Sequence, residues 1–237
     1  MDRQRQAEIF ESLAAHSPAR IGVGRTGTRA LTQEVLKLRL DHAHAVDAVY
    51  GEVSPALLAE FELFSVDTQF HDKELYLKRP DKGRLLSAEG SAAIVERCLM
   101  RPQVQVVVAD GLSAKAVDAN LPDILPALMD SLEANGLTAG TPFYVRGARV
   151  GCMDDIGRIL EPESLVLLIG ERPGLAAATS MSAYMCYRPY PGKKDSERTV
   201  ISNIHARGTP PVEAGAHIGS VLRKMLEQRM SGIGFIV

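Results

Sequence analysis

Leu165-Val-Leu-Leu-Ile-Gly-Glu-Arg-Pro-Gly-Leu175 is the stretch of sequence that decides the fold. Its five leading apolar residues, followed by glycine and a Pro-Gly turn, are typical of a strand buried on both faces of a parallel sheet. Side chains just beyond the carboxyl end of such a strand lie in the crevice where ligands bind, which makes Glu171 and Arg172 binding candidates. The alternative is a plain surface turn at 172–175 with solvated charges.

Strands and helices alternate on both sides of this stretch from residue 104 onward. The other expected strands are 104–109, 143–150, 182–188 and 199–202, with 233–237 as a closing strand. Residues 110–113 are expected to form a turn that leads into a helix. The other expected helices are 122–135, which opens at Pro122, a short one at 154–160, and a last one that begins after Thr209. This alternation predicts an α/β fold, a Rossmann-like and mostly parallel open sheet flanked by helices.

The first third of the chain lacks this alternation. Its apolar spacing predicts helices at 2–16, 32–49, 53–64 and 87–97, and an extended piece that closes on a turn at 74–83. We therefore divide the chain into a helical N-terminal region, residues 1–102, and a Rossmann-like domain, residues 103–237. His42 falls in the apolar stripe of the second helix, where we expect it to be packed and hydrogen-bonded.

Composition narrows the class of protein. A formal net charge of −2 over 237 residues gives no reason to expect nucleic acid or an anionic membrane as a partner. No apolar run approaches the roughly 20 residues that a bilayer span needs. The three cysteines, Cys98, Cys152 and Cys186, lack metal-ligand spacing and are expected to be buried thiols in a reducing, cytoplasmic compartment.

A glycine motif near the N-terminus raises the alternative of a stand-alone, nucleotide-dependent Rossmann oxidoreductase. Gly22-Val-Gly-Arg-Thr-Gly27 matches the dinucleotide fingerprint, and Asp41 follows at about the distance of the acid that holds the ribose. The fingerprint needs a strand before it and a second strand that carries the acid. Residues 19–23 are short for a strand and Asp41 lies in a helical pattern, so we expect no nucleotide site here.

The sequence contains few of the motifs that an enzyme acting alone would need. It has no Gly-x-Ser-x-Gly nucleophile elbow, and its six histidines show no metal-ligand spacing. His42 and His44 diverge by about 200 degrees on a helix and cannot share one ion. Asp154 and Asp155 are adjacent, diverge likewise and are expected to begin a helix. We assign no catalytic residue and no metal ligand, and we expect a binding domain.

Several longer motifs make the chain similar to a known family. In chain order they are Gly22-Val-Gly-Arg-Thr-Gly-Thr-Arg29, Asp41-His-Ala43, Tyr76-Leu-Lys-Arg-Pro-Asp81, Val104-Gln-Val-Val-Val-Ala-Asp-Gly-Leu-Ser113, Gly140-Thr-Pro-Phe-Tyr-Val-Arg146, Ile169-Gly-Glu-Arg-Pro-Gly-Leu175 and Ile201-Ser-Asn-Ile-His-Ala-Arg-Gly-Thr-Pro-Pro-Val-Glu-Ala214. They span nearly the whole chain. On them the chain closely resembles the small, or light, subunits of ethanolamine ammonia-lyase, the adenosylcobalamin-dependent bacterial enzymes that convert ethanolamine to acetaldehyde and ammonia.

The resemblance implies how the chain would act. A Rossmann-like small subunit packs against a large TIM-barrel subunit, in six copies of each, and adenosylcobalamin lies between them. The large subunit holds ethanolamine and most of the radical chemistry, while the small subunit contacts the corrin of the cofactor and its nucleotide side. By motif alignment these cofactor contacts fall on Val150, Glu171 and Val200. A purely structural partner subunit, which touches no cofactor, is the remaining alternative.

The third of these positions departs from the family, which often has cysteine where this chain has Val200. A cofactor contact made through the backbone is retained after such a change. A contact made through the thiol is lost.

Two further expectations come from absent motifs. Cobalamin enzymes that place histidine on cobalt use Asp-x-His-x-x-Gly, and no histidine here has aspartate two residues before it. We therefore expect base-on binding, with dimethylbenzimidazole retained on cobalt. Only about twenty residues precede Arg20-Ile-Gly22, where many family members carry a longer extension that directs them to a bacterial microcompartment. A cytoplasmic location is expected, and residence in a microcompartment is left open.

Overall fold

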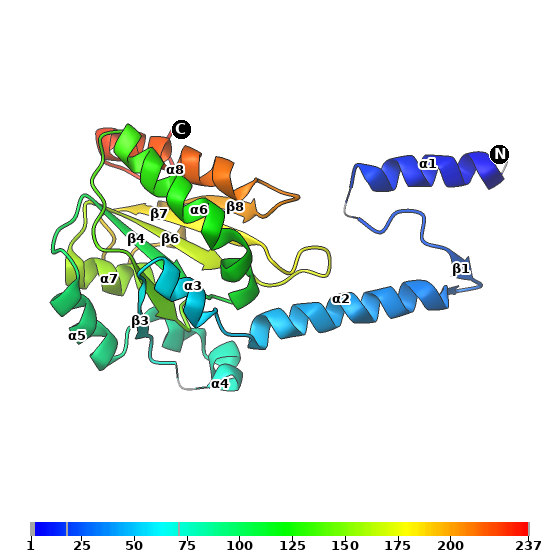
Figure 1. The fold of residues 1–237 in the computed structure, drawn as a ribbon, viewed down its shortest axis with the longest axis horizontal. Coiled ribbons are helices and arrows are strands. Elements are labelled where there is room, and N and C mark those ends of the chain that lie inside the picture. Colours follow the sequence, from blue (N-terminus) through cyan, green and yellow to red (C-terminus); the bar gives the residue numbers. More distant parts are fainter. Residues whose placement is uncertain (1–2, 18, 71, 237) are drawn as a thin grey trace.

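A mixed six-stranded sheet forms the centre of the molecule (Figure 1). The computed structural model describes residues 3–17, 19–70 and 72–236. The strands are β3 (Phe64–Asp67), β4 (Val104–Ala109), β5 (Phe143–Arg146), β6 (Ser164–Gly170), β7 (Met181–Tyr187) and β8 (Thr199–Ile204). They are arranged in the order β3-β5-β4-β6-β7-β8. The α/β class is therefore confirmed.

The sheet is parallel on one side of β6 and antiparallel on the other. β3, β5, β4 and β6 pair in parallel, whereas β7 and β8 are both antiparallel to their neighbours. Residues 171–180, all of which the structure describes, form no helix, and parallel strands need a crossover of a dozen or more residues. The order also differs from the 3-2-1-4-5-6 order of dinucleotide-binding Rossmann folds, so the Rossmann-like label is not confirmed.

Helices cover both faces of the sheet. On one face lie α6 (Ala114–Ala134) and α8 (Pro211–Gln228), and on the other lie α5 (Ala88–Arg97) and α7 (Cys152–Leu160) (Figure 1). Val166 and Leu168 of β6 join the core under α6 and α8, while Leu165, Leu167 and Ile169 join the core under α5 and α7. Every residue of β6 is buried, which confirms the doubly buried strand expected at 165–169.

α6 is longer than the sequence predicts. The turn into a helix expected at 110–113 is confirmed, because α6 begins at Ala114, where the Ser113 hydroxyl accepts a hydrogen bond from the Ala116 N–H. No helix opens at Pro122, because α6 continues through Pro122 and Pro126. The helix survives two prolines because a buried apolar stripe runs along its length. This stripe comprises Val117, Leu121, Ile124 and Leu128.

The first third of the chain contributes a strand that the sequence analysis missed. The helix expected at 53–64 is only α3 (Pro55–Glu60), and β3 follows it and pairs in parallel with β5. The extended piece expected at 74–83 is instead α4 (Lys73–Lys78) and a 3₁₀ helix (Pro80–Arg84). α4 forms because the Asp72 carboxylate caps it, accepting from the Leu75 N–H at 2.8 Å. Because β3 belongs to the central sheet, residues 1–102 are not wholly helical.

The closing strand expected at 233–237 is absent from residues 233–236, and Val237 lies outside the described residues. Gly232 and Gly234 have positive φ angles of 78° and 93°, which an extended strand does not allow. Ile233 is 83% exposed, so this segment leaves the core instead of joining the sheet.

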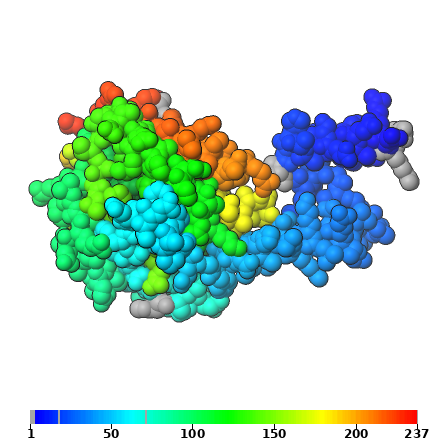
Figure 2. Space-filling model, in the orientation of Figure 1, coloured from blue at the N-terminus to red at the C-terminus, as the bar shows by residue number. Residues whose placement is uncertain are grey.

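An arm extends from the body of the molecule (Figures 1 and 2). It consists of α1 (Arg3–Ala15), the hairpin β1 (Arg25–Thr26) and β2 (Arg29–Ala30), and α2 (Thr32–Tyr50). Both helices lie where they were expected. The predicted packing of His42 is wrong, because its side chain is exposed, and Leu38 and Val46 of the same stripe are 41% and 40% accessible. Within the described ranges, no helix combines the length and apolarity that crossing a bilayer requires.

The core under α5 and α7 provides a direct test of the fold. Leu167→Ala removes a side chain with no solvent exposure, and we expect it to lower the free energy of unfolding by about 2–5 kcal/mol. The control Leu99→Ala truncates a side chain that is 60% exposed and is expected to change it by less than about 0.5 kcal/mol. Urea unfolding followed by circular dichroism measures both. Equal losses would contradict the burial of β6.

Candidate functional site

The loops that follow β4, β5 and β6 meet at the carboxyl edge of the sheet. The Asp110 carboxylate, just after β4, accepts hydrogen bonds from the N–H groups of Gly147 and Ala148 at 2.9 and 3.4 Å. The Tyr76 hydroxyl lies 2.8 Å from the Gly111 carbonyl oxygen and 2.7 Å from that of Ala148. β5 lies on one side of β4 and β6 on the other, so this edge is the topological switch point, where open α/β sheets bind ligands.

Glu171 occupies this edge directly after β6, as the sequence predicts. Its carboxylate accepts from the hydroxyls of Ser180, at 2.6 Å, and Ser182, and from the Asn203 N–H at 3.1 Å. Its own N–H donates to the Ser180 carbonyl at 2.9 Å. An ionised carboxylate offers about four acceptor positions. Glu171 therefore ties β6, β7 and β8 together and keeps about one acceptor position for a ligand.

A cavity of about 930 Å³ opens beside Glu171. It lies between the β6–β7 loop and the arm, and Figure 2 shows that loop, coloured yellow, projecting toward the arm. Alanines and Leu175 supply apolar lining. The polar and charged groups that line it include Glu171, Arg172, Arg207, Arg20, His16 and His205.

Val150 is not at the end of its strand. β5 stops at Arg146, and Gly147, with a φ of 68°, turns the chain away. Val150 therefore lies on the connection to α7, half-buried against the core under α5 and α7. Its carbonyl oxygen accepts from the Met153 N–H at 3.1 Å. The expected position at the strand end was wrong because β5 is four residues shorter than the apolar pattern.

Val200 lies in the edge strand β8, opposite Tyr184 of β7, and is 46% exposed. β8 is antiparallel to β7, which is itself antiparallel to β6, so β8 runs in the same direction as β6 and its carboxyl end, not its beginning, reaches the edge that carries Glu171. Accordingly Asn203 contacts Glu171 and Val200 does not line the cavity beside it. Among the described residues that line this cavity, Val150 is absent as well. A role for either residue in cofactor binding stays a prediction.

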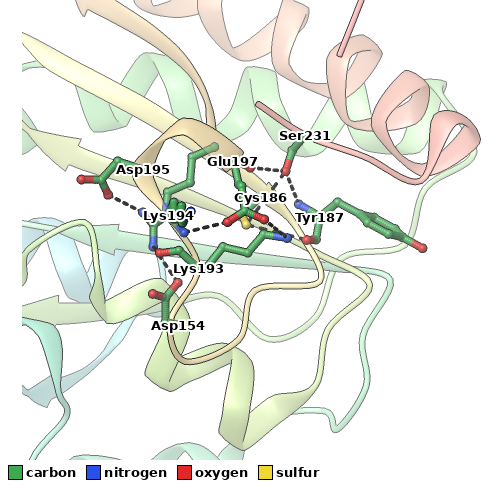
Figure 3. A network of polar contacts seen from close by, with 9 residues as sticks. Asp154, Cys186, Tyr187, Lys193, Lys194, Asp195, Glu197 and Ser231 are labelled. Carbon is green, nitrogen blue, oxygen red and sulfur yellow. Dashed lines mark hydrogen bonds and ion pairs between the residues drawn. The ribbon is translucent and has the colours of Figure 1, made fainter. Parts of the chain in front are cut away.

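A buried arginine links the start of β8 to α7. The Arg198 guanidinium, whose side chain is 2% exposed, pairs with Asp154 of α7 at 2.7 Å and with Asp195. Burial raises the pKa of Asp154, and Arg198 acts in the opposite direction. Figure 3 shows Lys193, Lys194, Asp195 and Glu197 grouped on the loop before β8, with Asp154 facing them. No local pattern indicates this pair, whose members are 44 residues apart.

The cysteines are buried free thiols, as expected. Burial raises the pKa of Cys98 to about 11 and raises the pKa of Cys186. Raised values keep these thiols protonated and unreactive near neutral pH. Among the described residues, no group of three or more histidine, cysteine or carboxylate side chains is placed to hold a metal ion.

Asp110 is a buried acid that the sequence analysis passed over, although an aspartate between a buried strand and a glycine was a usable signal. Burial raises its pKa to about 6 from 3.8, against the lowering effects of Lys73, whose Nζ lies 4.0 Å away, and of the backbone N–H groups. The folded protein therefore binds a proton between pH 3.8 and about 6 that the unfolded chain releases. This stabilises the fold at low pH and is lost as the pH rises through 6.

We expect Asp110→Asn to remove this contribution. At about 1.4 kcal/mol per pKa unit, the stability of the native protein relative to the variant falls by up to about 3 kcal/mol between pH 4 and pH 7. Urea unfolding of both proteins at several pH values in this range measures the difference. Asp123→Asn, on the exposed face of α6, is the control and should give a constant difference. A constant difference for Asp110→Asn as well would contradict the assignment.

Comparison of the chain with known proteins identifies its family. A family model described as "Ethanolamine ammonia-lyase light chain" matches residues 7–235. The chain is 48% identical to the ethanolamine ammonia-lyase small subunit of Fusobacterium nucleatum subsp. nucleatum, over 95% of this chain and 76% of that protein. The small subunit of Clostridium tetani is 46% identical over 98% and 79%, and that of Listeria innocua serovar 6a is 46% identical over 95% and 77%. The chain belongs to the family of ethanolamine ammonia-lyase small subunits.

Proposed function

We propose that the chain completes the adenosylcobalamin site of an ethanolamine ammonia-lyase, at the interface with a large TIM-barrel subunit. The reaction would convert ethanolamine to acetaldehyde and ammonia by a radical mechanism. Family membership supports the reaction and a large-subunit partner. The single observation that carries the cofactor role is Glu171, whose carboxylate lies at the carboxyl edge of the sheet with acceptor capacity left beside a large cavity.

The residues at this edge suit cobalamin. The rim of a corrin carries amide side chains, which donate hydrogen bonds and need acceptors. Glu171 can accept one such bond, and the alanines and Leu175 of the cavity can pack against the apolar surface of the ring. Val150 and Val200 are expected to contribute backbone and van der Waals contacts, because valine has no side-chain donor or acceptor. When bound, adenosylcobalamin supplies the radical by homolysis of its cobalt–carbon bond.

The chain itself would bind and orient the cofactor while the large subunit holds ethanolamine. Glu171 is fixed by three donors, so it presents a rigid acceptor and not a mobile one. The absence of an Asp-x-His-x-x-Gly motif supports base-on binding, and a protein histidine on cobalt would contradict it. The exposed apolar residues of α2 support a partner that covers the arm. Six copies of each subunit, and a cytoplasmic or microcompartment location, are part of the proposal.

No observation favours the stand-alone oxidoreductase. The glycine motif leads into a hairpin of two-residue strands, and Asp41 lies in α2, where it pairs with Arg20 at 2.6 Å. The described residues 19–24 form no strand. The βαβ context of a dinucleotide site is therefore missing from this part of the structure.

Acetaldehyde formation tests the reaction. Assays with adenosylcobalamin and ethanolamine should contain this chain alone, the large chain alone, and both together. We expect activity only in the mixture, because the cofactor site would be divided between the two chains. Activity of this chain alone, or none in an assembled mixture, would contradict the proposal.

Substitution of Glu171 separates a cofactor role from a purely structural one. We expect Glu171→Ala to weaken cobalamin binding by the assembled enzyme by about tenfold or more, the value of one charge-assisted hydrogen bond. Glu171→Gln, which keeps one acceptor oxygen, should lose less. Equilibrium dialysis measures affinity, and light scattering measures assembly.

The matched control is Glu133→Ala, which removes an exposed carboxylate near the end of α6. It should leave cobalamin affinity unchanged. Unchanged affinity in Glu171→Ala, with assembly intact, would remove Glu171 from the cofactor site.

A further inference from the structure

We propose that Arg172 and Arg207 form an anion site that binds the phosphodiester of the cobalamin nucleotide tail. The site lies in the cavity of about 930 Å³ beside Glu171. This inference rests on the proposed function and extends it from the corrin rim to the tail. It assigns two residues that the motif alignment does not include among the cofactor contacts.

The cavity lining has an excess of positive charge. The chain as a whole has a net charge of −2, yet the described residues that line this cavity include three arginines and one carboxylate. Arg20 is neutralised by Asp41 at 2.6 Å. Arg172 makes no hydrogen bond or ion pair with the described part of the chain. Among the described residues, the guanidinium of Arg207 donates to one group, the Ala176 carbonyl oxygen, at 2.5 Å. Two guanidinium groups are thus left without a counter-anion at one cavity wall.

The backbone around these arginines is held in place. Thr209 donates its N–H to the Asn203 carbonyl at 2.9 Å, and the Arg207 N–H lies 3.3 Å from Nδ1 of His205. The bond from Arg207 to Ala176 joins this turn to the β6–β7 loop that carries Arg172. A site that is arranged before its ligand arrives loses less free energy on ordering.

The lining identifies the kind of anion. Guanidinium groups bind phosphate oxygens through paired N–H donors, and the apolar wall of alanines beside them suits an organic ligand. The nucleotide phosphodiester is the negatively charged group of cobalamin. Glu171 would accept from corrin amides while the next residue, Arg172, binds the anion, so opposite charges would face opposite groups of one ligand.

Cobinamide, which has the corrin but lacks the nucleotide and its phosphodiester, makes the test selective. The assembled enzyme is prepared with native chain, with Arg172→Gln, Arg207→Gln and the double variant, and with the control Arg223→Gln on α8. Binding of hydroxocobalamin and of cobinamide is measured by equilibrium dialysis. We expect the double variant to bind cobalamin about tenfold or more weakly and cobinamide unchanged. The control should bind both as the native protein does.

Salt provides a second readout. Added sodium chloride should weaken cobalamin binding more in the native protein than in the double variant, because screening acts on the charge that the variant lacks. Equal losses for cobalamin and cobinamide would overturn the anion site, as would unchanged cobalamin affinity. Loss of assembly in each single variant would also overturn it, since the arginines would then hold the large subunit. Failure of the proposed function itself would look different, because the native assembly would bind neither compound.

Discussion

The backbone contact between the loops after β4 and β6 is the constraint on which the binding edge depends. A Cβ atom on Gly111 would lie 2.3 Å from the Gly170 carbonyl oxygen, and one on Gly170 would lie 2.2 Å from the Ser113 carbonyl oxygen. Neither position admits a side chain. The Leu112 N–H donates to the Gly170 carbonyl at 3.1 Å, which closes the two loops on each other. Glu171, the next residue, is therefore aimed by a contact that only glycine allows.

Hydrogen bonds connect the residue after this contact, Glu171, to the neighbouring strands. Glu171 links β6 to β7 and β8 through hydrogen bonds to Ser182 and Asn203, although β7 runs opposite to β6 and β8. An antiparallel pair can be joined by a short loop, and this loop is free to carry Arg172 into the cavity. The change of strand direction after β6 is thus what places a carboxylate and an arginine side by side at an open cavity.

The sequence predicted the parts of the fold that one local pattern determines. Residues 165–169 were found because a short apolar run before a Pro-Gly turn has few alternatives, and α2 was found from its spacing. β3 was missed because it has only four residues, too few for its Phe-Ser-Val-Asp alternation to stand out from the helical spacing before it. α4 was missed because its stability depends on the Asp72 cap and on Tyr76, whose hydroxyl contacts carbonyls far along the chain. The direction of β7 depends on the loop at 171–180, and the apolar pattern of a strand does not show in which direction the strand runs.

The three family positions also show what local patterns cannot supply. Glu171 was placed correctly because it follows its strand at once, whereas Val150 and Val200 depend on tertiary structure. Val150 lies two residues before α7, and Val200 lies two residues after Arg198, which pairs with Asp154 in the first turn of α7. Both valines are therefore positioned relative to the same end of one helix, although 50 residues separate them. A ligand that touched all three positions would have to extend from the carboxyl edge of the sheet onto the face that α7 covers.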